Sequence, residues 1–127
     1  MTAGATAPLI LLVEDEWLIA TTVAEALNQH GCEVLGPAPT VARALSFLEA
    51  AHPHMAIIDF RLARETTEDI LPVLDAMKIP VCVLSGYAAA QLPTRYQCYR
   101  FLEKPFRMHE LFATVDELLA ENHPSSG

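Results

Sequence analysis

The sequence predicts a doubly wound α/β domain, in which helices cover both faces of a five-stranded parallel sheet. Five short apolar segments alternate with longer segments whose apolar residues recur at helical spacing. The short segments are residues 9–13, 32–35, 55–58, 81–84 and 99–102. Three of them are nearly continuous apolar runs, which is typical of parallel strands buried on both faces. The alternation predicts five strands and five helices.

The first two helical segments have recognisable ends. Residues 17–30 carry apolar residues along one stripe, and Gly31 follows as a stop signal, because glycine readily adopts the left-handed conformation that closes a helix. Thr40 precedes the second helix, where its hydroxyl can accept a hydrogen bond from an amide of the first turn. We therefore expect the first helix to end near Gly31 and the second to begin after Thr40.

Two of the remaining helical segments contain a proline. Residues 69–77 contain Pro72, which a helix tolerates when the proline falls in its first turn. Pro93 interrupts residues 88–97, so the sequence supports this fourth helix least. The last helix is expected over residues 108–121, where apolar residues again form one stripe.

Length and composition indicate one domain. The chain has 127 residues, 52% of them hydrophobic, which is enough for a single core. We expect the domain over residues 9–121, with flexible ends at 1–8 and 122–127. No apolar run could span a bilayer and no secretion signal is recognisable, so we expect a cytoplasmic protein. The net charge of −8 disfavours binding to nucleic acids or anionic membranes.

Polar residues occur where the predicted strands end. Glu14 and Asp15 follow the first strand, Asp59 follows the third, and Ser85 and Lys104 follow the fourth and fifth. Ligands bind at the carboxyl ends of parallel strands, so we expect these side chains to lie close together. Two carboxylates about 4 Å apart repel each other by about 4 kcal/mol at an effective dielectric constant near 20. Oxygen donors without His or Cys favour Mg²⁺ as the cation that relieves this repulsion.

These residues and their spacing resemble the response-regulator receiver domains of two-component signalling, of the stand-alone, single-domain type. The similarity extends over residues 9–121 and is carried by Glu14, Asp15, Asp59, Ser85, Gly86, Lys104, Pro105 and Phe106. It implies a flavodoxin-like strand order, 2-1-3-4-5. It also implies a response regulator that receives a phosphoryl group from a sensor histidine kinase or phosphotransfer protein and switches its contacts with a downstream protein.

The resemblance implies a role for each residue near the phosphate. Asp59 would be the phosphoacceptor, and Lys104 would contact a phosphoryl oxygen. Mg²⁺ would be bound by Asp15, by Asp59 and by the backbone carbonyl of Arg61. Glu14 would act on the metal mainly through water, and the backbone of Arg61 would also contact the phosphate. The activity would be self-catalysed phosphotransfer with slow autodephosphorylation, and whether this makes the protein an enzyme is partly convention.

The switch would lie beside the phosphate. The resemblance implies that Ser85 hydrogen-bonds to a phosphoryl oxygen and that the backbone of Gly86 contacts the phosphate. Phe101 matches the aromatic switch position, and Tyr87 borders the site as a further switch residue. The peptide bond that precedes Pro105 is expected to be cis, as in the family.

The loop after Asp59 departs from the family. Position 63 is alanine where a proline is common, and no glycine occurs between Asp59 and Asp69, so we expect an unusual loop shape. Arg61 and Arg64 in this loop have two interpretations. They could steady the phosphoryl group or steer the partner, or they could be ordinary solvated charges.

Two alternative functions remain. A pseudo-receiver would be a binding module whose interactions do not depend on phosphorylation, and the unusual loop keeps this interpretation open. A flavodoxin-like cofactor binder would need a phosphate-binding loop rich in Ser, Thr and Gly after the first strand. Residues 14–16 are all acidic instead, and they would repel a flavin phosphate.

Overall fold

The computed structural model describes residues 7–122, which form a five-stranded parallel sheet. The strands are β1 (Leu9–Val13), β2 (Glu33–Ala38), β3 (Met55–Asp59), β4 (Val81–Ser85) and β5 (Arg100–Glu103). Their order is β2-β1-β3-β4-β5, so the predicted flavodoxin-like sheet is confirmed. The ends that we expect to be flexible, 1–8 and 122–127, fall almost entirely outside the described residues.

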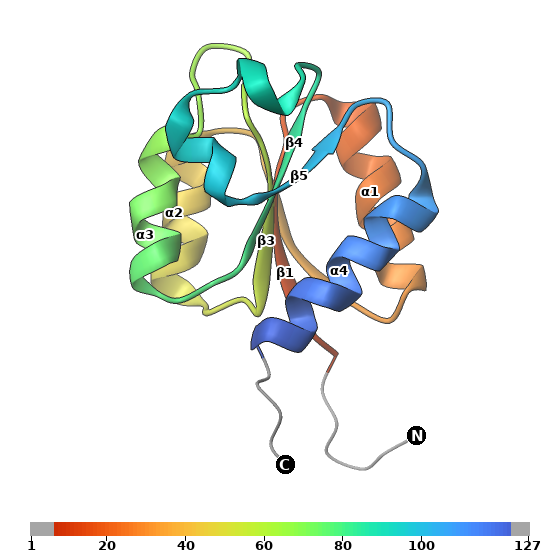
Figure 1. The fold of residues 1–127 in the computed structure, drawn as a ribbon. Coiled ribbons are helices and arrows are strands. Elements are labelled where there is room, and N and C mark those ends of the chain that lie inside the picture. Colours follow the sequence, from red (N-terminus) through yellow and green to blue (C-terminus); the bar gives the residue numbers. More distant parts are fainter. Residues whose placement is uncertain (1–6, 123–127) are drawn as a thin grey trace.

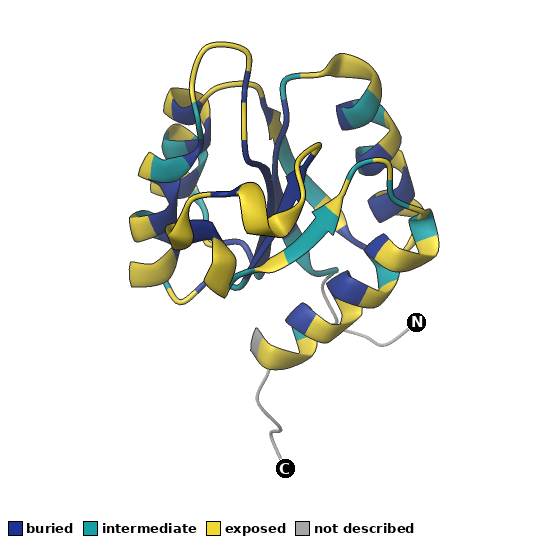
Figure 2. Cartoon of the chain, turned by 45° about the horizontal axis from the view of Figure 1, so that its top comes forward, coloured by how far each residue is buried: buried dark blue, intermediate teal, exposed yellow. Residues whose placement is uncertain are grey.

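Helices cover both faces of the sheet (Figure 1). They are α1 (Trp17–Gln29), α2 (Val41–Ala50), α3 (Leu71–Ala76) and α4 (Met108–Asn122). None of these four helices is long and apolar enough to cross a membrane. The helices α1 and α4 pack on one face with Ile10 and Leu12 of β1, and α2 and α3 pack on the other with Leu11 and Val13. Figure 2 shows the resulting burial of the central strands, which explains their unbroken apolar runs.

The local end signals act as predicted in α1, α2 and α3. The Thr40 hydroxyl accepts a hydrogen bond from the amide of Arg43 at 3.1 Å and caps α2. Gly31, with φ of +89°, follows the end of α1. Pro72 lies in the first turn of α3. That helix begins later than predicted, because a 3₁₀ turn, η1 (Glu68–Ile70), precedes it.

Strand β2 continues past its predicted end. The pair Gly36 and Pro37 suggests a stop, yet the strand resumes at Ala38, which lies opposite Val13 after a register shift. The Gly36–Pro37 peptide bond is cis, and Gly36 has φ of +115°. A Cβ atom at Gly36 would lie 2.8 Å from the carbonyl oxygen of Leu12, so only glycine fits.

The connection between β4 and β5 is not an α-helix, which corrects the prediction of five helices. Residues 88–98 form two 3₁₀ turns instead, η2 (Ala89–Gln91) and η3 (Thr94–Cys98). Leu92 is extended, with ψ of 153°, as is usual for a residue that precedes proline. Pro93 also has no amide hydrogen to donate to a helical ladder. The proline therefore divides the connection into two short turns.

Candidate functional site

Five predicted site residues come together at the carboxyl ends of the strands. Asp59 is the last residue of β3, Ser85 is the last residue of β4, and Lys104 directly follows β5. Glu14 and Asp15 follow β1, which lies beside β3 in the sheet. We call these five residues the rim. The predicted convergence of the rim residues is therefore confirmed as geometry.

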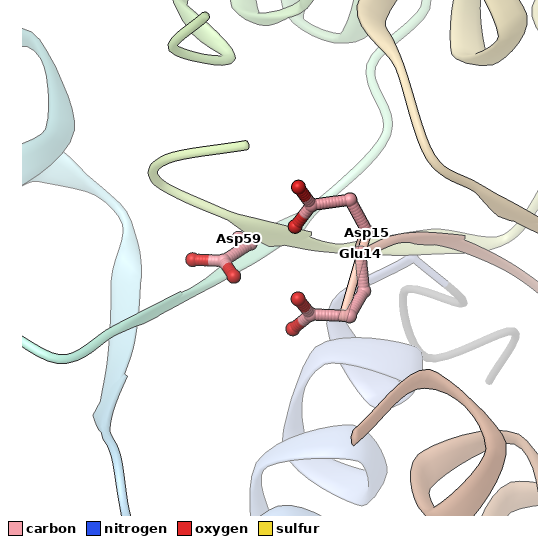
Figure 3. A group of neighbouring side chains, drawn as sticks. All are labelled: Glu14, Asp15 and Asp59. Atoms are coloured by element: carbon pink, nitrogen blue, oxygen red, sulfur yellow. The ribbon is translucent and has the colours of Figure 1, made fainter. Parts of the chain in front are cut away.

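Three carboxylates of the rim lie close enough to share one ligand (Figure 3). Oxygen atoms of Glu14, Asp15 and Asp59 all lie within 4.8 Å of one another. Glu14 is 2% exposed and Asp59 is 5% exposed, whereas Asp15 is half-buried. Burial leaves little water to screen these charges, so they repel one another unless cations or protons compensate them.

Lys104 supplies part of the compensation. Its ammonium donates to Oδ2 of Asp59 at 2.7 Å and to Oε1 of Glu14 at 3.0 Å. Burial alone would lower the pKa of Lys104, but the hydrogen bonds and attraction from Asp59 and Glu14 outweigh it and raise the pKa. Lys104 is therefore a fixed positive charge, yet one ammonium cannot neutralise three carboxylates.

The pKa of Glu14 reflects the burial and the crowding of these carboxylates. Burial raises the pKa of its carboxyl to about 7, and its hydrogen bond with Asp59 and their mutual repulsion act in the same direction. The amide of Glu16 and the ammonium of Lys104 oppose this rise by hydrogen bonding to the Glu14 carboxylate. Burial and the nearby charge of Asp59 thus both favour the protonated form of Glu14, and Lys104 offsets them only in part.

The donor set of the rim fits a hard divalent cation. Among residues 7–122, these three acids are the one group of acidic, His or Cys side chains whose ligand atoms are this close together. All donors are carboxylate oxygens, which Mg²⁺ prefers and which Zn²⁺ or Cu²⁺ sites usually supplement with nitrogen or sulfur. The geometry and the charge together make the rim a candidate Mg²⁺ site.

Backbone amides orient the carboxylates. The amide of Ala63 donates to Oδ2 of Asp15 at 2.5 Å, which ties the loop after β3 to the rim. The amide of Arg61 lies 3.4 Å from Oδ1 of Asp59, a weak contact. The Ala63 amide therefore holds the carboxylate of Asp15 in place, whereas the Arg61 amide constrains that of Asp59 only weakly. Figure 3 shows the three side chains side by side.

Ser85 of the rim and the adjacent Gly86 lie at the end of β4, the strand beside β3. The Ser85 side chain is 1% exposed, and its Oγ accepts a hydrogen bond from the amide of Tyr87 at 2.9 Å. The carbonyl of Ser85 accepts from the amide of Lys104 at 2.7 Å. Gly86 is exposed, and among the described residues no atom other than those of Gly86 itself and its two chain neighbours lies within 4 Å of the position where a Cβ would stand. The surface beside Ser85 is therefore open to a ligand.

Comparison with known proteins identifies the family of this chain. The family model of the response regulator receiver domain matches residues 10–116. The chain belongs to the receiver domain family of response regulators. The curated relatives include the transcriptional regulatory protein PdtaR of Mycobacterium tuberculosis, 28% identical over 111 residues. They also include the DNA-binding transcriptional regulator NtrC of a Bradyrhizobium species, 34% identical over 119 residues.

The receiver covers only part of those relatives. The match spans 84% of this chain and 54% of PdtaR, and 88% of this chain and 24% of NtrC. Solved structures share the fold of this chain. The solution structure of SdrG from Sphingomonas melonis matches with a TM-score of 0.78 at 30% identity, over 91% of this chain and 98% of SdrG. The crystal structure of the response regulator PhyR from Brucella abortus matches with a TM-score of 0.82 at 27% identity. The match covers 94% of this chain and 51% of the PhyR chain.

Of the predicted switch residues, Ser85 belongs to the rim, and Phe101 and Tyr87 lie outside it. Phe101 is half-buried in β5 and packs against the apolar cluster under α2 and α3. Tyr87 is 48% exposed and meets the ring of Phe60 edge-on, with centroids 6.2 Å apart. The peptide bond between Lys104 and Pro105 is cis, as expected for a receiver.

The loop after β3 forms a narrow turn. Arg61 and Thr66 pair as an antiparallel bridge, and the amide of Leu62 donates to the carbonyl of Glu65 at 2.8 Å. Leu62 is buried, whereas Arg61 and Arg64 are exposed. The carboxylate of Glu65 accepts from the amide of Val41, which ties the turn to the start of α2. These backbone hydrogen bonds and the contact with α2 shape a loop that lacks the proline and glycine common in the family.

Sequence reasoning missed two buried residues near the rim. Thr67 is 0% exposed, and its Oγ1 donates to the carbonyl of Asp59 at 2.8 Å. Tyr96 is 1% exposed, and its hydroxyl lies 3.0 Å from Thr67 Oγ1. Neither stands at a predicted strand end, and their contact joins segments 29 residues apart. The one available signal was Tyr96 itself, a large aromatic residue in a connection that Pro93 interrupts.

Proposed function

We propose that this receiver domain accepts a phosphoryl group from the phosphohistidine of a sensor histidine kinase or phosphotransfer protein onto the carboxylate of Asp59. The observation that carries this proposal is the ammonium of Lys104, 2.7 Å from Oδ2 of Asp59, inside a cluster of three carboxylates. One oxygen of Asp59 bonds to phosphorus as the phosphorus–nitrogen bond breaks. The electron pair of that bond stays on the leaving imidazole.

Charge neutralisation is the main task of the site. The transferred group spreads negative charge over its outer oxygens, and catalysis consists largely of positioning and of balancing that charge. Lys104 provides one positive charge at Asp59 before the phosphoryl group arrives. Asp15, Asp59 and the carbonyl of Arg61 would hold Mg²⁺, with Glu14 acting through water. When bound, this ion supplies the second positive charge toward the phosphoryl oxygens.

The neighbouring residues fit the other roles. The Oγ of Ser85 already accepts a hydrogen bond from the amide of Tyr87, so its own hydrogen is available for a phosphoryl oxygen. The exposed backbone of Gly86 can approach the same group closely. Phe101 and Tyr87 would respond to the movement of Ser85 and change the surface near β4 and β5. Slow attack of water on the acyl phosphate would return Asp59 to its free form.

The surface next to the rim suits docking of the phosphohistidine-bearing partner. Trp17 and Leu18, in the first turn of α1, are 76% and 69% exposed. Beside them lies a largely apolar groove of about 410 Å³, lined in part by Leu18, Ile19, Val23, Lys104, Phe106 and Met108. Because Lys104 belongs to both the groove and the rim, a partner seated here would present its histidine to Asp59. A cytoplasmic location would suit such a partner.

The test uses beryllofluoride, which mimics a phosphoryl group on a carboxylate. In the presence of Mg²⁺, we expect a ¹⁹F signal of bound beryllofluoride and a change in Trp17 fluorescence, and both should be absent in Asp59→Asn. We also expect a small phosphoramidate donor to label the wild type and not Asp59→Asn. A chain that binds neither Mg²⁺ nor beryllofluoride at millimolar concentrations would instead be a binding module that acts independently of phosphorylation.

A further inference from the structure

Two buried side chains join the connection at residues 88–98, called here the 88–98 segment, to strand β3. The Oγ1 of Thr67 lies 2.8 Å from the carbonyl oxygen of Asp59 and 3.2 Å from that of Phe60. The hydroxyl of Tyr96, which belongs to η3, lies 3.0 Å from Thr67 Oγ1. Both side chains are almost completely buried, so bulk water does not compete for these hydrogen bonds.

The direction of these hydrogen bonds follows from the groups involved. A carbonyl oxygen can only accept, so Thr67 uses its one hydroxyl hydrogen toward the backbone carbonyl of Asp59. Tyr96 must then donate its own hydrogen to Thr67 Oγ1. Burial raises the pKa of Tyr96, so its phenol keeps this hydrogen. A directed relay therefore runs from Tyr96 through Thr67 to Asp59, and each bond polarises the next.

Ring contacts connect the same two regions. Phe60, the residue after Asp59, meets the ring of Tyr96 edge-on, with centroids 4.9 Å apart at 88°. Phe60 also meets Tyr87 edge-on, at 6.2 Å and 85°. Tyr96 thus contacts the residue that follows Asp59 with its ring, and it reaches the carbonyl of Asp59 with its hydroxyl. Both contacts would register a displacement of the backbone at Asp59.

The 88–98 segment has little else to hold it in place. Within residues 88–98, Leu92 and Tyr96 are the buried side chains. Its two 3₁₀ turns are short and lack the long ladder of hydrogen bonds that stiffens an α-helix. The segment lies on the face of the sheet covered by α2 and α3, and it follows Ser85 and Tyr87 in the chain (Figure 1). A small displacement of Tyr96 can therefore move the whole segment.

We propose that Tyr96 is a positioning residue that couples phosphorylation of Asp59 to the placement of the 88–98 segment. The proposal rests on the proposed function, because it requires a phosphoryl group on Asp59. The side chain and the carbonyl of Asp59 share one Cα atom, so forces on the carboxylate also act on the carbonyl. Thr67 transmits that shift to Tyr96, and the segment then presents a different surface to a partner protein.

The experiment separates binding at Asp59 from the response of the segment. Binding is measured by the ¹⁹F signal of beryllofluoride in the presence of Mg²⁺. The response is measured by hydrogen exchange of the amides in residues 88–98, with Mg²⁺ alone and after beryllofluoride is added. In the wild type, we expect beryllofluoride to change these exchange rates by at least about fivefold, the lower end of usual coupling between sites.

Three variants test the relay. Tyr96→Phe removes the hydroxyl and keeps the ring contact with Phe60, and Thr67→Val removes the middle hydroxyl at nearly constant shape. Both should keep the ¹⁹F signal while the exchange response falls below about twofold. In the double variant, the exchange response should fall no further than in either single variant, because all three variants break the same relay. Tyr99→Phe is the control, since the Tyr99 hydroxyl bonds to Asp75 rather than to the relay.

Each outcome decides between the two proposals. Bound beryllofluoride with a wild-type exchange response in both Tyr96→Phe and Thr67→Val would overturn the relay and leave phosphotransfer intact. An equal loss of response in Tyr99→Phe would overturn it too, because general loosening of the segment would then suffice. If the wild type shows no bound ¹⁹F signal, the proposed function fails, and the relay fails with it.

Discussion

The rim and the 88–98 segment meet at Asp59 but are held by different kinds of interaction. The rim is a cluster of charges at strand ends, in which Lys104 bridges Glu14 and Asp59. The 88–98 segment is held by apolar contacts and by the neutral hydroxyl of Tyr96. Charges respond directly to a phosphoryl group, whereas a neutral segment responds only through the backbone it touches.

This difference assigns the two regions separate tasks in a receiver. In the proposed function the rim would supply the chemistry, because its groups are placed by the sheet and carry the charge that phosphoryl transfer requires. The 88–98 segment would supply the movement, because short 3₁₀ turns anchored by few buried side chains can shift at low cost. Interfering with each region should therefore produce effects of different size and kind.

The largest effect on stability is expected from Tyr96→Ala. Deleting a buried aromatic ring costs about 3–5 kcal/mol, and here the change also removes the hydrogen bond to Thr67. Urea unfolding would measure the loss. Tyr96→Phe is the matched control and should cost only about 1 kcal/mol, the usual contribution of one hydrogen bond. A loss below about 1 kcal/mol for Tyr96→Ala would mean that other contacts anchor the segment.

The next largest effect is expected in the rim, from Lys104→Met. Removing the ammonium leaves the carboxylates of Glu14 and Asp59 without their shared partner. We expect a loss of about 2 kcal/mol, less than for a fully buried pair, because Glu14 can take up a proton. Urea unfolding in EDTA would measure this loss.

Repeating the unfolding of Lys104→Met with Mg²⁺ tests whether the ion binds at the rim. A divalent cation at the rim should raise the free energy of unfolding of Lys104→Met by more than that of the wild type, since it replaces the missing charge. Lys104→Arg keeps the positive charge and should behave more like the wild type. An equal gain from Mg²⁺ in Lys104→Met and in the wild type would indicate that the ion binds away from the carboxylate cluster.

The rim could be predicted from the sequence because topology places it. Once five parallel strands are recognised, their carboxyl ends meet at one edge, and Glu14, Asp15, Asp59, Ser85 and Lys104 are found by reading the residue at each end. The helix caps and stops follow from equally local signals, such as the Thr40 hydroxyl.

The shape of the 88–98 segment could not be predicted in this way. Pro93 warns against a helix, but no local pattern tells where the chain goes instead. Its path depends on Tyr96 meeting Thr67 and Phe60, which lie in the loop after another strand. The path of β2 at Gly36 is similar, because the fit of this residue depends on the distant carbonyl of Leu12. Contacts between distant segments decided both features.

A smaller effect on stability is expected from Pro93→Ala. This variant tests whether the shape of the 88–98 segment is set locally by Pro93 or by the tertiary contacts of Tyr96. Proline restricts the unfolded chain, so replacing it should lower the free energy of unfolding by about 0.4–1 kcal/mol. Because the buried side chain of Tyr96 still holds η3, we expect unchanged helix content by far-UV circular dichroism. A gain in helix content with weaker protection of the amides in η3 would show that Pro93 alone keeps the segment from being a helix.

The smallest effect is expected from Arg95→Ala, one residue from Tyr96. Nη1 of Arg95 lies 3.8 Å from Oε1 of Glu68, and the two side chains are 51% and 36% exposed. Such a long, solvated ion pair contributes under about 0.5 kcal/mol, and its contribution should shrink as salt is added. Urea unfolding at low and high salt would measure it. A loss comparable to that of Tyr96→Ala would mean that surface charge holds the segment, and the contrast between a charged rim and a neutral segment would not hold.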